Sequence, residues 1–253
     1  MSNVRTVSDT KRAFYGTHTR PINAIYRRVV EELMVEMHLL LVNVNFSYDA
    51  IYALGVVSVY DRFMAGYEPE SDRTSIYSAL IGSILGDPAQ YRSDAAEVLE
   101  AAKTVPSVEA FKSLLEEAKT SGGDSLKGNL NKVITNPKFK YSRLFATGLY
   151  NVLEAIDADV LDDNDKREAL LKEIAGTLGF NEELVIKDIE LYRSNLVKMA
   201  QAQEVMKDMV EAEKKKQAKR EQDKADRAAK KAAEATAKDA EPTDTADSVK
   251  PEA

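Results

Sequence analysis

The sequence predicts an all-α protein: a multi-helix bundle followed by a long, coiled-coil-like C-terminal helix and a disordered acidic tail. Apolar side chains recur at intervals of three and four residues along most of the chain, which is the period of a helix. No alternation typical of strands and no βαβ pattern occurs. Glycine and proline are sparse, at 11 and 7 of 253 residues, so we expect few tight turns.

The first elements of the chain follow from its cap and breaker residues. We expect residues 1–9 to be flexible and residues 10–183 to form the bundle. Ser8 and Asp9 can cap a short helix over 10–15, and Pro21 suits the first turn of the next helix. An apolar stripe predicts that this second helix has about 20 residues; its members are Ile22, Ile25, Val29, Leu33, Met37 and Leu40.

Turn residues divide the rest of the bundle, for which we expect about nine helices in all. Ser47 can cap a mostly buried helix over 48–64. Gly82 and Gly86 are four residues apart, which favours a close contact between helices. The other helices are expected over 72–85, 88–103 and 108–119, up to about residue 135, along an aromatic-rich face over 139–156, and from a turn at 162–165 to residue 178.

The last helix, expected over 184–238, carries the most regular pattern. Its apolar seam alternates steps of four and three, as in a heptad repeat, through Val185, Ile189, Tyr192, Leu196, Met199, Gln203, Met206 and Val210. The seam predicts burial either against the protein's own bundle or against a partner, and the sequence leaves both open. Residues 211–238 are rich in Ala, Lys and Glu without an apolar face, and 239–253 have the composition of a disordered segment.

Composition and charge limit the classes of function. The net charge of −7 argues against nucleic acid as a partner, because phosphate binding depends on clustered positive charge. The chain has no cysteine, so disulfides and thiolate metal sites are excluded. The longest uncharged runs, residues 37–48 and 50–60, are shorter than the roughly 20 residues of a spanning helix, and residues 1–15 lack the apolar core of a signal peptide. We expect a protein that is soluble or peripheral to a membrane.

Two histidines are the most reactive side chains that the sequence offers. A di-metal site of the ferritin type needs Glu-x-x-His on one helix, but the residue three before His38 is Val35. We therefore expect His38 to be a packed, hydrogen-bonded residue. His18 lies in an expected loop, where it can form a local hydrogen bond or contact a partner. We predict no enzyme, no catalytic residue, no metal ligand and no cofactor.

Four segments resemble the thylakoid formation / photosystem II biogenesis family of cyanobacteria and plastids. They are residues 11–40 (KRAFYGTHTRPINAIYRRVVEELMVEMHLL), 48–67 (YDAIYALGVVSVYDRFMAGY), 139–154 (FKYSRLFATGLYNVLE) and 188–199 (DIELYRSNLVKM). The four segments are spread along nearly the whole of the expected folded part, from residue 11 to residue 199. Plant relatives begin with a plastid transit peptide, which this sequence lacks, so it resembles a cyanobacterial member.

The resemblance implies a non-catalytic accessory or adaptor protein. Such proteins support thylakoid membrane biogenesis and photosystem II assembly and repair, and they promote the accumulation of FtsH proteases at the thylakoid. The implied partners are a thylakoid FtsH protease complex and photosystem II assembly intermediates. The implied location is the cytoplasmic side of the thylakoid membrane, where the protein would be peripheral and partly soluble.

Six residues are our candidates for partner binding. His18, Arg20 and Arg27 belong to the first resembling segment, and Leu196, Met199 and Met206 belong to the seam. Two other functions remain open. The protein could be a membrane-shaping or lipid-binding protein that uses the lysine-rich extension on anionic lipid, or a metal-binding helical protein built on His38 and inner carboxylates.

Overall fold

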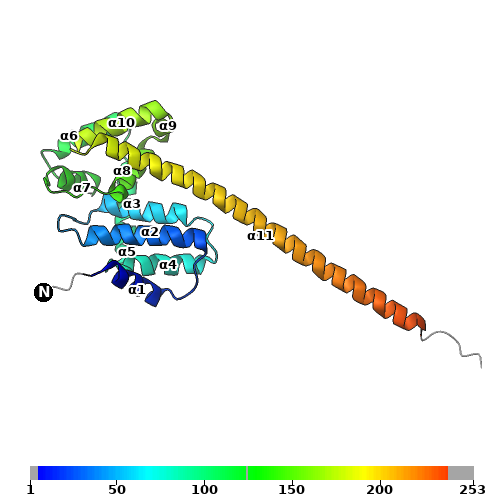
Figure 1. Cartoon of the computed structure of the whole chain (residues 1–253). Helices are drawn as coiled ribbons and strands as arrows, with labels where there is room; N and C mark the ends of the chain where they lie inside the picture. The colour runs from blue at the N-terminus through cyan, green and yellow to red at the C-terminus, as the bar shows by residue number, and fades with distance from the viewer. Residues whose placement is uncertain (1–4, 124, 239–253) are drawn as a thin grey trace, which may run out of the picture. The chain divides into compact units, whose positions relative to one another are not determined.

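Eleven helices and no strand make up the described part of this computed structural model, which comprises residues 5–123 and 125–238, with side chains as far as Ala228 (Figure 1). The all-α prediction is therefore confirmed, with two more helices than expected. The helices are α1 (Val7–Thr17), α2 (Ala24–Leu41), α3 (Ala50–Phe63), α4 (Glu70–Ser83), α5 (Pro88–Lys103), α6 (Val108–Ala118), α7 (Ser125–Ile134), α8 (Arg143–Ile156), α9 (Ala158–Asp162), α10 (Asn164–Thr177) and α11 (Glu182–Lys238).

The chain divides into two units, and α11 contributes to both. The first unit extends through Met199 and the second begins at Ala200. In the first unit α1 lies against α4, and α3 packs between α5 and α8 (Figure 1). The expected disordered tail, 239–253, lies outside the described residues.

The first two helices begin at other residues than expected. Thr6, not Ser8 or Asp9, is the N-cap of α1: its hydroxyl accepts from the Asp9 N–H, and the Asp9 carboxylate accepts from the Thr6 N–H at 3.0 Å. The segment expected to be flexible through residue 9 therefore already contains the first turn of α1. Asn23 caps α2, so Pro21 precedes that helix instead of occupying its first turn.

The centre of the first unit is the crossing of α3 and α8, where two glycines allow the backbones to meet. A Cβ on Gly55 would lie 1.7 Å from the Leu144 carbonyl oxygen, and one on Gly148 would lie 1.9 Å from the Ile51 carbonyl oxygen. Only glycine permits this approach. The expected contact at Gly82 is wrong, because a Cβ there would meet no atom within 4 Å.

The first half of the seam on α11 is buried within the first unit. Val185, Ile189, Tyr192 and Met199 are buried, and Leu196 is half-buried. Of the two alternatives for the seam, packing against the protein's own bundle therefore accounts for its first five positions. Pairing as a coiled coil stays a prediction. In the second unit Gln203 is half-buried, whereas Val205, Met209 and Val210 are exposed.

Candidate functional site

An open groove in the first unit lies beside α2, the start of α8 and the first part of α11. It consists of a narrow inner cavity of about 120 Å³ and a wider outer part of about 870 Å³. The two parts are adjacent, because both are lined by Glu32, Glu36, Arg143, Leu191 and Asn195. We call this feature the α2–α11 groove.

Apolar side chains line much of the groove, and two of them are exposed on its rim. Leu39 on α2 is 57% exposed and Leu191 on α11 is 41% exposed. Leu39 lies one residue before the buried Leu40, so it points away from the core-facing side of α2. The inner cavity has apolar walls from the core, formed by Leu33, Val59, Phe63, Leu144 and the ring of Tyr192.

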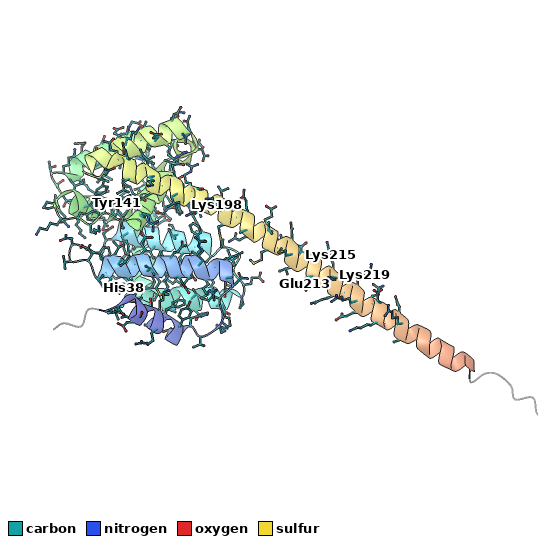
Figure 2. All side chains as sticks on the ribbon, in the orientation of Figure 1. His38, Tyr141, Lys198, Glu213, Lys215 and Lys219 are labelled. Atoms are coloured by element: carbon teal, nitrogen blue, oxygen red, sulfur yellow. The ribbon has the colours of Figure 1, made fainter. Side chains whose placement is uncertain are left out.

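Three carboxylates, of Glu32, Glu36 and Asp188, and the guanidinium of Arg143 line the inner cavity. Arg143 donates from Nη2 to Oε2 of Glu36 at 2.8 Å and from Nε to Oε1 at 3.4 Å. Tyr141 donates its hydroxyl to Oδ2 of Asp188 at 2.8 Å (Figure 2). Burial raises the pKa of both Glu36 and Asp188, and Arg143 opposes this effect at each. Asp188 raises the pKa of Glu36 further, so the two negative charges repel each other.

A second set of polar contacts closes the α1 side of the groove. Glu31 on α2 accepts from the Tyr15 hydroxyl at 2.7 Å and forms an ion pair with Lys11 at 3.4 Å. Burial, followed by this hydrogen bond and the charge of Glu31, raises the pKa of Tyr15 to about 12. These contacts hold α1 against α2 and leave the charge of Glu31 compensated.

The three candidates from the first resembling segment lie outside the groove. His18 is only 1% exposed, its Nδ1 lies 3.0 Å from the Ser75 hydroxyl oxygen, and burial lowers its pKa. His18 is therefore a structural residue and not a surface contact, because it is enclosed between α1 and α4. Arg20 is more than half exposed and lies 2.5 Å from the buried Asp72, and Arg27 is exposed on α2.

The three candidates from the seam are also absent from the groove lining. Met199 is only 7% exposed, so its side chain is buried in the structure, and its role as a partner contact stays a prediction. Leu196 and Met206 are half-buried. The apolar stripe of α2 contributes Val29, Leu33 and Leu40 to the lining, but the exposed Leu39 on the rim lies beside that stripe. The available signal was a second apolar pair on α2, Val35 and Leu39, four residues apart.

His38 has the packed role expected of it. It is buried, and its Nδ1 lies 2.9 Å from the Thr10 hydroxyl oxygen, which joins α2 to α1 (Figure 2). Among residues 5–123 and 125–228, whose side chains are described, there is no group of three or more histidine and carboxylate side chains arranged to hold a metal ion. No helix in the same part of the chain combines the length and apolar character needed to cross a membrane.

Known proteins resemble this chain over most of its length. The family model described as Thylakoid formation protein matches residues 6–221. Protein Thf1 of Crocosphaera subtropica is 53% identical over 219 residues, covering 86% of this chain and 89% of that protein. Protein Thf1 of Nostoc punctiforme is 52% identical over 222 residues, covering 88% and 94%. The solved structure of Psb29 at 1.55 Å has a TM-score of 0.74 and 43% identity, and it covers 85% of this chain and 99% of that one.

Proposed function

This chain belongs to the thylakoid formation protein family, and from that premise we propose that it is a non-catalytic adaptor that binds a thylakoid FtsH protease complex and photosystem II assembly intermediates. The role in thylakoid biogenesis is that of the family. The proposal adds three points to this role: the partners, the repair of photosystem II, and a position on the cytoplasmic side of the thylakoid membrane.

The observation that carries the proposal is the α2–α11 groove. Protein interfaces combine a few apolar anchors with a polar rim. The groove has this composition: Leu39 and Leu191 are exposed apolar side chains, and Glu32, Asn195 and Arg143 surround them. Leu39 and Leu191 line the same open groove, so one binding partner could cover both of these exposed aliphatic side chains.

Binding would support a partner by mass action. A protein that binds the assembled form of a complex, and not its separated subunits, shifts the equilibrium toward the assembled form. The accumulation of a protease complex then follows from binding alone, and no bond needs to be made or broken by this chain.

The test is affinity purification of the tagged full-length protein from thylakoid extract, followed by mass spectrometry. Leu39→Glu and Leu191→Glu each place a charge on an apolar rim of the groove. We expect each to reduce the recovery of FtsH subunits and photosystem II intermediates by about tenfold.

Leu85→Glu is the matched control, because Leu85 is a 76% exposed leucine that does not line the groove. Circular dichroism would establish that all three variants are folded. Recovery that stays at the wild-type level in both groove variants would refute the groove as the partner surface.

A specific observation in the second unit favours contact with anionic lipid as a second candidate function. Residues 214–220 contain five cationic side chains, all exposed: Lys214, Lys215, Lys216, Lys219 and Arg220; Lys215 and Lys219 are labelled in Figure 2. Clustered Lys and Arg near an anionic surface contribute about 1 kcal/mol each. Flotation of the full-length protein with anionic vesicles at low salt tests this candidate, and equal flotation with neutral vesicles would rule out the electrostatic contact.

A further inference from the structure

The inner cavity of the α2–α11 groove has the size of a single side chain. Its volume of about 120 Å³ is well below the roughly 300–1,000 Å³ of typical small-molecule sites, yet exceeds what one water molecule needs. The wider outer part of the groove, about 870 Å³, lies beside it and shares five lining residues with it. A peptide segment lying in the outer part could therefore insert one side chain into the cavity.

The lining of the cavity combines an apolar wall with carboxylates. Leu33, Val59 and Phe63 supply the wall, and Glu32, Glu36 and Asp188 supply the carboxylates. A lysine or arginine side chain has the complementary construction, because an aliphatic stem packs on apolar surface while the charged head reaches polar groups.

The charges at the inner end are not balanced. Arg143 is the only cationic residue that lines the cavity, and it is directed at Glu36 through two hydrogen bonds. Asp188 accepts from the Tyr141 hydroxyl, but no cation among residues 5–123 and 125–228 lies within ion-pair distance of it. Arg143 and Lys187 attract Asp188 without forming an ion pair with it, and burial still raises its pKa, so part of the cost of desolvating this half-buried carboxylate is not recovered.

We propose that the inner end of the α2–α11 groove receives a lysine or arginine side chain of the protein partner, whose cationic head pairs with Asp188; this rests on the proposed function. The partner's charge would offset the desolvation of Asp188 and relieve its repulsion with Glu36. An acidic or phosphorylated side chain would add a further negative charge to the carboxylates already present and is disfavoured.

The direct test uses n-butylguanidinium, a model of the arginine side chain, in an NMR titration of the full-length protein. We expect saturable shifts of the Leu191 and Asn195 amides, and no such shifts with the neutral n-butylurea. Asp188→Asn removes the charge but keeps a carbonyl oxygen for the Tyr141 hydroxyl. It should weaken binding of the probe by about fivefold.

Glu173→Gln is the matched control, because it also removes one carboxylate of the first unit, paired with Lys112 and outside the groove. It should leave the affinity for the probe unchanged. The inference is overturned if the probe shifts no groove resonance, or if Asp188→Asn and wild type bind it equally.

Partner capture separates this inference from the proposed function. Reduced capture by both Leu191→Glu and Asp188→Asn supports the two together. Capture that is reduced by Leu191→Glu but unchanged by Asp188→Asn overturns the basic side chain and leaves the groove as the partner surface. Capture that is unchanged by either variant overturns the groove as the partner surface, and failure of the wild-type protein to capture either partner overturns the proposed function itself.

Discussion

The buried carboxylate of Asp49 offers a quantitative test of how burial and capping oppose each other. Asp49 is the N-cap of α3 and accepts from the Tyr52 N–H at 2.8 Å, yet it is only 7% exposed. Burial raises its pKa from 3.8 to about 6, against the opposing effects of the backbone hydrogen bonds from Tyr52 and Ile51 and of the charge of Lys132. The capping contact is therefore made by a carboxylate whose ionised form is disfavoured in the folded state.

The sign of the pH effect follows from this shift. Because the folded-state pKa is raised, Asp49 contributes stability below the unfolded pKa of about 4, and this contribution is lost as the pH rises through about 6. A shift of about two units corresponds to about 3 kcal/mol. Asp49→Asn keeps an N-cap oxygen and has no charge to bury.

We expect Asp49→Asn to remove this loss of stability. At about pH 7.5 its free energy of unfolding should exceed that of wild type by about 2–3 kcal/mol, after about 0.3–1 kcal/mol is subtracted for the lost attraction of a negative charge to the helix N-terminus. At about pH 4, where wild-type Asp49 is protonated in the folded protein, the gain should vanish.

Reversible urea unfolding followed by tyrosine fluorescence measures the difference. All 11 tyrosines precede Ala200 and the chain has no tryptophan, so the signal reports the first unit alone. Asp87→Asn, at the exposed N-cap of α5, is the control and should show no gain that depends on pH. A stability difference between Asp49→Asn and wild type that is the same at both pH values would refute the reasoning.

Three further predictions concern packing and capping. Gly148→Ala should lower the free energy of unfolding by about 3 kcal/mol or more, because the added Cβ would lie 1.9 Å from a carbonyl oxygen of α3. Gly82→Ala should raise the free energy of unfolding by about 0.5–1 kcal/mol, because no atom lies within 4 Å of the added Cβ. Equal effects of the two substitutions in urea titrations would contradict this difference in packing. Arg167→Lys should lower the free energy of unfolding by about 2 kcal/mol in the same titration. Lysine cannot reproduce the several hydrogen bonds of this buried guanidinium, which include one of 2.8 Å to the Leu161 carbonyl oxygen. Unchanged stability would show that these hydrogen bonds contribute nothing. Thr6→Ala should cost about 1 kcal/mol and speed amide exchange in the first turn of α1, and exchange as slow as in wild type would argue against the capping box.

Helices whose ends depend on local chemistry could be predicted from the sequence. The expected ranges 88–103 and 108–119 agree with α5 and α6 to within one residue, because Asp87-Pro88 and Ser107 act through neighbouring backbone groups. The start of α3 was misplaced by two residues, since both Ser47 and Asp49 are competent caps. The choice between them lies in the packing around the helix, where Asp49 is buried.

The α2–α11 groove, in contrast, depends on residues that meet only in the folded chain. Glu36 and Arg143 are 107 residues apart, and Asp188 comes from a third helix. The sequence by itself determined the helical period, the family and most helix ends, because capping and apolar spacing act over a few residues. Only the tertiary structure decided that Leu39 and Leu191 share an open groove, and that the first half of the seam packs on its own bundle, because apolar burial has no direction and leaves the choice of partner to the fold.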